Sequence, residues 1–144
     1  MGRLINPENA GKERIRLTRA VVLALRELGR QTAPGAEARD LAAFMALALE
    51  AIAATIDASV AAWEKRGYWV KADRFRMDWQ WTGTMARKLR EALLAGDWGQ
   101  VAALSAQIAQ KLDKVTVPER HRIGRPWQGA WEEFQKQHAG DPNR

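Results

Sequence analysis

The sequence lacks cysteine, and this absence removes several kinds of chemistry at once. Without a thiol the chain cannot form a disulfide, a zinc–thiolate site or a cysteine nucleophile. Histidine occurs only twice, at His121 and His138, and proline only five times among 144 residues. Because proline is rare and most of the eleven glycines lie between apolar segments, the composition indicates a helical globular protein.

Recognisable catalytic and metal-binding motifs are missing as well. The sequence has no Gly-x-Ser-x-Gly turn, no phosphate-binding glycine loop, and no Glu-x-x-His pair of the kind that di-iron helical bundles need. His121 stands between Arg120 and Arg122 in a basic stretch, where a lone histidine is more typical of a surface residue than of a catalytic base. We therefore predict a protein that is not an enzyme, with no catalytic residue, metal site, cofactor or small-molecule substrate.

A membrane location is not expected from the sequence. The first residues do not include the apolar stretch typical of a secretory signal. The most apolar segment, residues 41–63, is long enough to cross a bilayer. It contains Glu50 and Asp57, however, each of which would cost about 2.5–3.5 kcal/mol at the bilayer centre. We expect this segment to be a buried helix of a cytoplasmic protein that does not bind membranes.

Apolar residues recur at helical spacing in four long segments, at about residues 7–30, 35–66, 68–95 and 98–117. Four amphipathic helices joined by short loops bury their apolar faces most simply against one another. A basic stretch, residues 118–125, follows, and Pro126 can begin a short amphipathic helix at 126–138. We predict an all-α fold in one domain over residues 1–144, an antiparallel four-helix up-down bundle with a short C-terminal fifth helix.

Residues 68–82 allow two interpretations. The stretch from Phe75 to Trp81 alternates strictly between apolar and polar residues, which is typical of a strand. Helical spacing of apolar residues nevertheless continues from Ala72 to Leu93, and a lone strand would have no partner in this chain. The helix is therefore favoured. On it, Arg74 and Asp78 stand four residues apart, which favours a local ion pair over a polar link between helices.

Cations form a row on the first predicted helix, on the face opposite its apolar residues. The chain carries a net charge of +6 and has an isoelectric point of about 10.2, and further arginines lie in the 118–125 stretch. Phosphate groups of a nucleic acid are a suitable partner for such a row. The residues predicted to contact nucleic acid or another polyanion are Lys12, Arg16, Arg19, Arg26, Arg30, Arg120, Arg122 and Arg125.

The same row of cations is compatible with two alternatives to a polyanion contact. It could be only a solvated face that keeps the protein soluble. It could also meet the acidic stripe Glu50, Asp57 and Glu64, which repeats every seven residues on the second predicted helix, in another copy of the chain.

Tryptophan is the second unusual feature, with seven residues. Three of them, Trp63, Trp79 and Trp98, belong to apolar stripes and fit a core. The other tryptophans lie outside these stripes. Three aromatic residues share one face of the predicted C-terminal helix. The residues predicted to dock on a partner or within the molecule are Trp69, Trp81, Trp127, Trp131 and Phe134.

Two functions fit these features. The first is a non-catalytic interaction or scaffold subunit of a larger assembly, whose partner is a protein or a second copy of the chain. The alternative is a ribonucleoprotein subunit that binds RNA or single-stranded DNA without regard to sequence. Small, basic, all-helical subunits of CRISPR effector complexes offer an analogy of size and class only, because no motif supports it.

Overall fold

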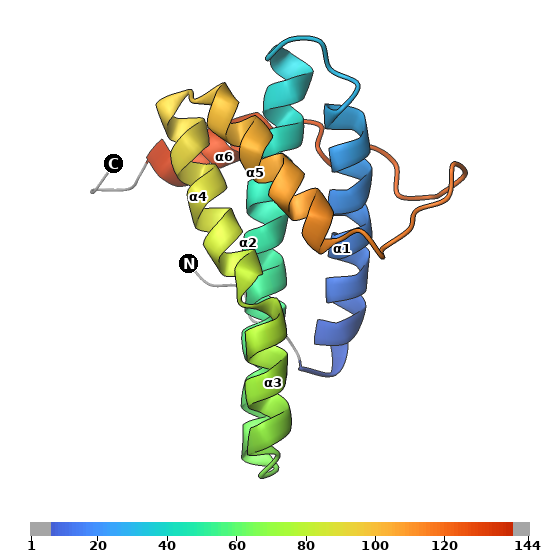
Figure 1. Cartoon of the computed structure of the whole chain (residues 1–144), viewed down its shortest axis with the longest axis vertical. Coiled ribbons are helices and arrows are strands. Elements are labelled where there is room, and N and C mark those ends of the chain that lie inside the picture. The colour runs from blue at the N-terminus through green and yellow to red at the C-terminus, as the bar shows by residue number, and fades with distance from the viewer. Residues whose placement is uncertain (1–6, 140–144) are drawn as a thin grey trace.

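The chain forms six helices in the computed structural model, which describes residues 7–139 (Figure 1). Every regular element in that range is helical, so the all-α prediction is confirmed and the strand interpretation of residues 68–82 is wrong. The helices, in chain order, are α1 (Pro7–Leu28), α2 (Ala36–Lys65), α3 (Trp69–Trp79), α4 (Trp81–Ala95), α5 (Trp98–Lys111) and α6 (Ala130–Ala139).

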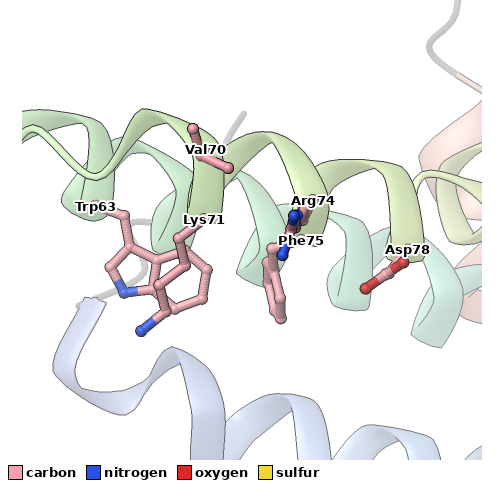
Figure 2. Close-up of a pocket in the computed structure, with 6 residues that line it drawn as sticks. All are labelled: Trp63, Val70, Lys71, Arg74, Phe75 and Asp78. Carbon is pink, nitrogen blue, oxygen red and sulfur yellow. The ribbon is translucent and has the colours of Figure 1, made fainter.

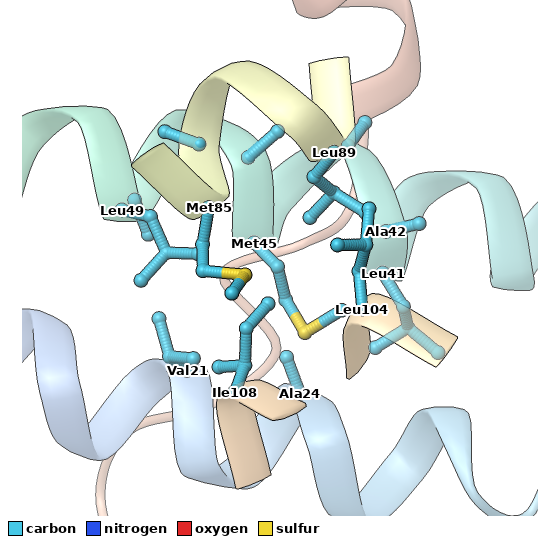
Figure 3. Packing of buried hydrophobic residues seen from close by; sticks show 14 of the residues in the cluster. Val21, Ala24, Leu41, Ala42, Met45, Leu49, Met85, Leu89, Leu104 and Ile108 are labelled. Atoms are coloured by element: carbon cyan, nitrogen blue, oxygen red, sulfur yellow. The ribbon is translucent and has the colours of Figure 1, made fainter. Parts of the chain in front are cut away.

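The 30-residue helix α2 is the centre of the molecule. It packs against α1, α3, α4 and α6, while α5 packs on α4 and reaches α1. In Figure 3, Leu49 and Met45 of α2 lie among Val21 of α1, Met85 of α4 and Ile108 of α5. Burial of these and the other apolar side chains of the core stabilises the fold, since apolar burial contributes about 25 cal/mol per Å².

Helix α2 is also the one described helix with the length and apolarity to cross a membrane. Of its most apolar window, 56% is buried inside the protein. Neighbouring parts of the protein thus cover somewhat more than half of this window.

The expected third helix is interrupted at Gln80, which separates α3 from α4. The Thr82 hydroxyl donates a hydrogen bond of 2.8 Å to the carbonyl of Trp79 and so joins the two helices across the break. Just beyond the break α4 packs close to α2, where a Cβ atom on Gly83 would lie 3.7 Å from that of Ala53, an ordinary van der Waals contact. The continuous period of apolar residues did not reveal this break.

The C-terminal helix also differs from expectation. It begins at Ala130 rather than near residue 126, and Trp127 lies in the preceding turn. Helix α5 ends at Lys111, which lengthens the connection to α6. The backbone N–H of Trp131 donates to the Asp40 carboxylate at 2.9 Å, and that of Gly129 donates to it at 3.3 Å. Asp40 thus caps α6 from α2, because the first N–H groups of a helix have no partner within it.

Replacing Asp40 with alanine should loosen α6. Loss of a capping carboxylate typically costs about 1 kcal/mol, and we expect a decrease of this size in the free energy of unfolding. Amide hydrogen exchange over residues 130–139 should accelerate, whereas Asp40→Asn, which keeps an acceptor oxygen, should have the smaller effect. Unchanged exchange in Asp40→Ala would show that this cap does not hold the helix.

Candidate functional site

The cation row of α1 is partly neutralised by its own helix. Arg16 forms an ion pair of 2.6 Å with Glu13, and Arg30 forms one of 2.8 Å with Glu27. The hydrogen bond to Glu13 raises the pKa of Arg16, with a smaller contribution from the opposite charge. Two of the five predicted contacts on this helix are therefore already paired with carboxylates.

The other members of the row differ among themselves. The Arg26 guanidinium donates a hydrogen bond to the carbonyl of Val117, so it fastens the long connection after α5 to α1. Arg19 is half-buried, and Lys12 is exposed. A regular row in sequence therefore becomes a set of cations in four different environments.

The arginines of the 118–125 stretch divide in the same way. Arg120 and Arg122 are exposed, whereas Arg125 pairs with Glu37 at the start of α2. The Arg125 guanidinium also lies 5.7 Å from the ring centre of Trp127. Arg125 therefore helps to hold the chain that leads into α6.

Four of the five aromatic residues predicted to dock are packed within the molecule. Trp127 and Phe134 are only 3% and 1% exposed. Trp131 stacks on Phe134 with ring centres 5.7 Å apart, and Trp81 stacks on Trp79 at 6.4 Å. These rings fix α6 and the α3–α4 junction and offer little surface to a partner.

The fifth residue, Trp69, lies in a different setting. It belongs to a stretch in which Tyr68, Trp69, Val70 and Met77 are 54%, 60%, 68% and 70% exposed. Ala72 is the one buried residue of α3. Four of the six large apolar side chains found exposed in the described residues are thus in or next to one short helix.

The position of α3 explains this exposure. Figure 1 shows α3 and the C-terminal part of α2 extending together past the rest of the helices. Helix α3 packs on α2, which leaves its outer side without a covering element among residues 7–139. We call this end of the molecule the hairpin surface. Its residues are Lys65, Arg66, Tyr68, Trp69, Val70, Lys71, Arg74 and Met77.

A groove of about 490 Å³ runs along one side of α3 (Figure 2). In Figure 2, Lys71, Phe75 and Asp78 point from α3 toward α1, and Trp63 joins them from α2. The groove combines aromatic walls with charge, and Asp78 is the only carboxylate among its lining residues. These residues are Trp63, Val70, Lys71, Arg74, Phe75 and Asp78.

Aromatic rings hold the cations beside this groove. The Lys71 ammonium lies 4.6 Å from the ring centre of Trp63, and the Arg14 guanidinium lies 4.7 Å from that of Phe75. The two rings meet edge to face at 4.8 Å. Cations on aromatic faces gain electrostatic attraction without losing their positive charge, so they stay available to an anion.

Arg14 is a functional candidate that the sequence did not reveal. It lies within the apolar arc of α1, and its guanidinium donates hydrogen bonds of 3.4 Å to the hydroxyls of Thr55 and Ser59 on α2. Burial lowers the pKa of Arg14 from its ordinary value. Arg14 therefore joins α1 to α2 and, through Phe75, to the groove.

Arg74 and Asp78, both within the described residues, form no ion pair with each other. The polar link between helices is made instead by Arg76, which pairs with Glu64 of α2 at 3.0 Å and with Asp73 at 2.6 Å. Hydrogen bonds, first to Glu64 and then to Asp73, raise the pKa of Arg76. Arg74 is left exposed at the groove.

Residues 7–139 contain no cluster of three histidine or carboxylate side chains that could hold a metal ion. His121 accepts a hydrogen bond from the backbone N–H of Ile123 at Nδ1, and the His138 ring packs 4.4 Å from Phe134.

The hairpin surface is the part of the described chain with the strongest features of a binding site. Neither a known protein family, nor a curated protein, nor a solved structure matches the chain.

Proposed function

We propose that the protein is a non-catalytic interaction subunit of a larger assembly and that it binds its partner through the hairpin surface. The observation that carries the proposal is the clustering of Tyr68, Trp69, Val70 and Met77, each more than half exposed, on one projecting helical hairpin. Exposed aromatic and methionine side chains are enriched where proteins bind partners.

The arrangement of the other helices supports this role. We propose that α1, α2, α3–α4 and α5 act as an antiparallel up-down bundle, in which α3 and α4 together are the third helix. The bundle would hold α2 rigid, so that its end presents α3 at a fixed position. In this proposal the protein is cytoplasmic, and α2 remains inside the bundle because several helices already cover it.

Purification of a tagged chain from its native host tests the proposal. The double variant Trp69→Ala, Met77→Ala should lose most of the material that purifies with the wild-type chain. Both side chains are exposed, so their removal should change the free energy of unfolding by less than about 0.5 kcal/mol.

A matched control is available elsewhere on the surface. Ile15 of α1 and Leu94 of α4 are also large, apolar and exposed, and Ile15→Ala, Leu94→Ala removes comparable side chains. This control should purify with the same components as wild type. Retention of those components by the hairpin variant would refute binding at this surface.

A further inference from the structure

Rings and cations occur together around the end of the hairpin. Helix α2 ends at Lys65 and is followed by Arg66. Tyr68 precedes α3, which begins at Trp69 and has Lys71 in its first turn. The rings of Tyr68 and Trp69 make none of the ring contacts found in the described residues. Open aromatic faces next to cations are the combination that binds single-stranded nucleic acid, in which bases stack and phosphates pair with charge.

We infer that the partner of the hairpin surface is a single-stranded nucleic acid. The inference rests on the proposed function and names the partner class at that same surface. Bases stack on Tyr68 and Trp69, and phosphates lie against Lys65, Arg66, Lys71 and Arg74. None of the groups involved reads the edge of a base, so binding is nearly independent of sequence.

The lack of carboxylate partners for its cations favours this surface over the row on α1. Lys65, Arg66, Lys71 and Arg74 are all exposed, and within residues 7–139 none of them forms an ion pair with a carboxylate. On α1, by contrast, two of the five cations have a carboxylate partner and a third is bound to a carbonyl. A phosphate at the hairpin therefore displaces no existing ion pair.

A second copy of the chain is a poorer fit to these charges. The chain has a net charge of +6, and two hairpin surfaces that face each other would bring the same unpaired cations together. Repulsion between like charges opposes such a contact. A polyanion brings the opposite charge and releases counterions when it binds.

The geometry also indicates how long a strand has to be to contact both sides of the hairpin. Trp69 and Lys71 are two positions apart on a helix, which places them on nearly opposite sides of α3. A strand that touches both has to pass over the end of the hairpin, a path comparable with the helix diameter of about 10–12 Å. At the rise of about 3.4 Å per nucleotide of a stacked strand, this path corresponds to about three nucleotides.

Asp78 in the groove distinguishes a nucleic acid from a protein partner. Lys71 and Arg74 line it and attract phosphate, whereas Asp78 is its one carboxylate and repels it. Removing this negative charge with Asp78→Asn should strengthen binding, by about twofold at an exposed site. A protein partner that uses Asp78 as a hydrogen-bond acceptor would bind the same variant more weakly.

Fluorescence anisotropy with labelled dT20 and U20 tests the inference. In 50 mM NaCl the full chain should bind either strand with a Kd below about 100 µM, because non-specific binding has a Kd of about 1–100 µM at physiological salt and is tighter at lower salt. Trp69→Ala should weaken binding by about 5- to 100-fold, as expected for the loss of one stacked base. Raising the salt to 200 mM should weaken it by about 50-fold if four phosphates are neutralised.

Charge variants separate the two basic surfaces. Lys71→Gln, Arg74→Gln should reduce the salt dependence by about 1.4 in log Kd per log unit of salt, whereas Arg16→Gln, Arg30→Gln should leave it nearly unchanged. Binding should also be weaker for a dT3 strand than for dT8. A 20-base-pair duplex should bind less well than the strand, because its bases are not free to stack.

Three results would overturn the inference. They are no binding of either strand at 100 µM protein in 50 mM NaCl, an equal decrease of the salt dependence in the α1 control variant, or an unchanged affinity in Trp69→Ala. The proposed function can survive when the nucleic-acid inference fails. If neither strand binds and the hairpin variant still loses a protein partner in the native host, the hairpin binds protein and only the nucleic-acid inference is wrong.

Discussion

Replacing Phe134 with alanine should lower the free energy of unfolding by about 3–5 kcal/mol. This ring is 1% exposed, stacks on Trp131 and packs against His138, and it belongs to the same core cluster as the centre of α2. Its removal leaves a cavity and also frees the segment that leads from the 118–125 stretch into α6.

Denaturant titration followed by tryptophan fluorescence measures this effect. The neighbouring variant Gln135→Ala, at an exposed position of the same helix, should change the free energy of unfolding by less than about 0.5 kcal/mol. If Phe134→Ala unfolds at the same denaturant concentration as wild type, α6 is not part of the cooperative core. Hydrogen exchange would then show residues 130–139 as a separately opening unit.

The second large effect is expected at Leu49, in the middle of α2. Its side chain is fully buried and lies near Val21 of α1 and Met85 of α4 (Figure 3). Leu49→Ala should cost about 2–5 kcal/mol, because three helices lose contacts and the site can relax only partly. The comparison variant Leu94→Ala removes the same side chain from an exposed position and should cost far less. Equal loss in the two variants would contradict a core centred on α2.

The sequence predicted the helices well and their interruptions less well. The helical spacing of apolar residues identified α1, α2 and α5 and placed Val101, Leu104 and Ile108 on a buried face. The break at Gln80 leaves no periodic signal, and the bond from Thr82 to the carbonyl of Trp79 does not explain it alone, because Thr18 and Thr55 make the same bond inside unbroken helices. The early end of α5 and the late start of α6 are set by the connection between them, which packs its own Val117 and Trp127.

The proposed binding surface was harder to find from sequence than the core. A regular row of cations on α1 looked like a site, but Glu13 and Glu27 lie one turn away and neutralise two of its members. The projection of the hairpin depends on α2 being 30 residues long while α1 has 22, and on which part of α2 each neighbour covers. Val70 and Met77 therefore looked like ordinary helix residues until their exposure was known.

Chemical labelling of a single introduced thiol tests the hairpin surface most directly. Because the chain has no cysteine, Met77→Cys gives one reactive site on α3, and Arg16→Cys gives a comparison site on α1. The measurement is the rate of alkylation of each thiol in the assembly from the native host and in the isolated chain. We predict that the thiol at position 77 reacts at least tenfold more slowly in the assembly, while the thiol at position 16 reacts equally in both. Equal rates at position 77, with protection at position 16, would contradict the hairpin as the partner-binding surface and favour α1.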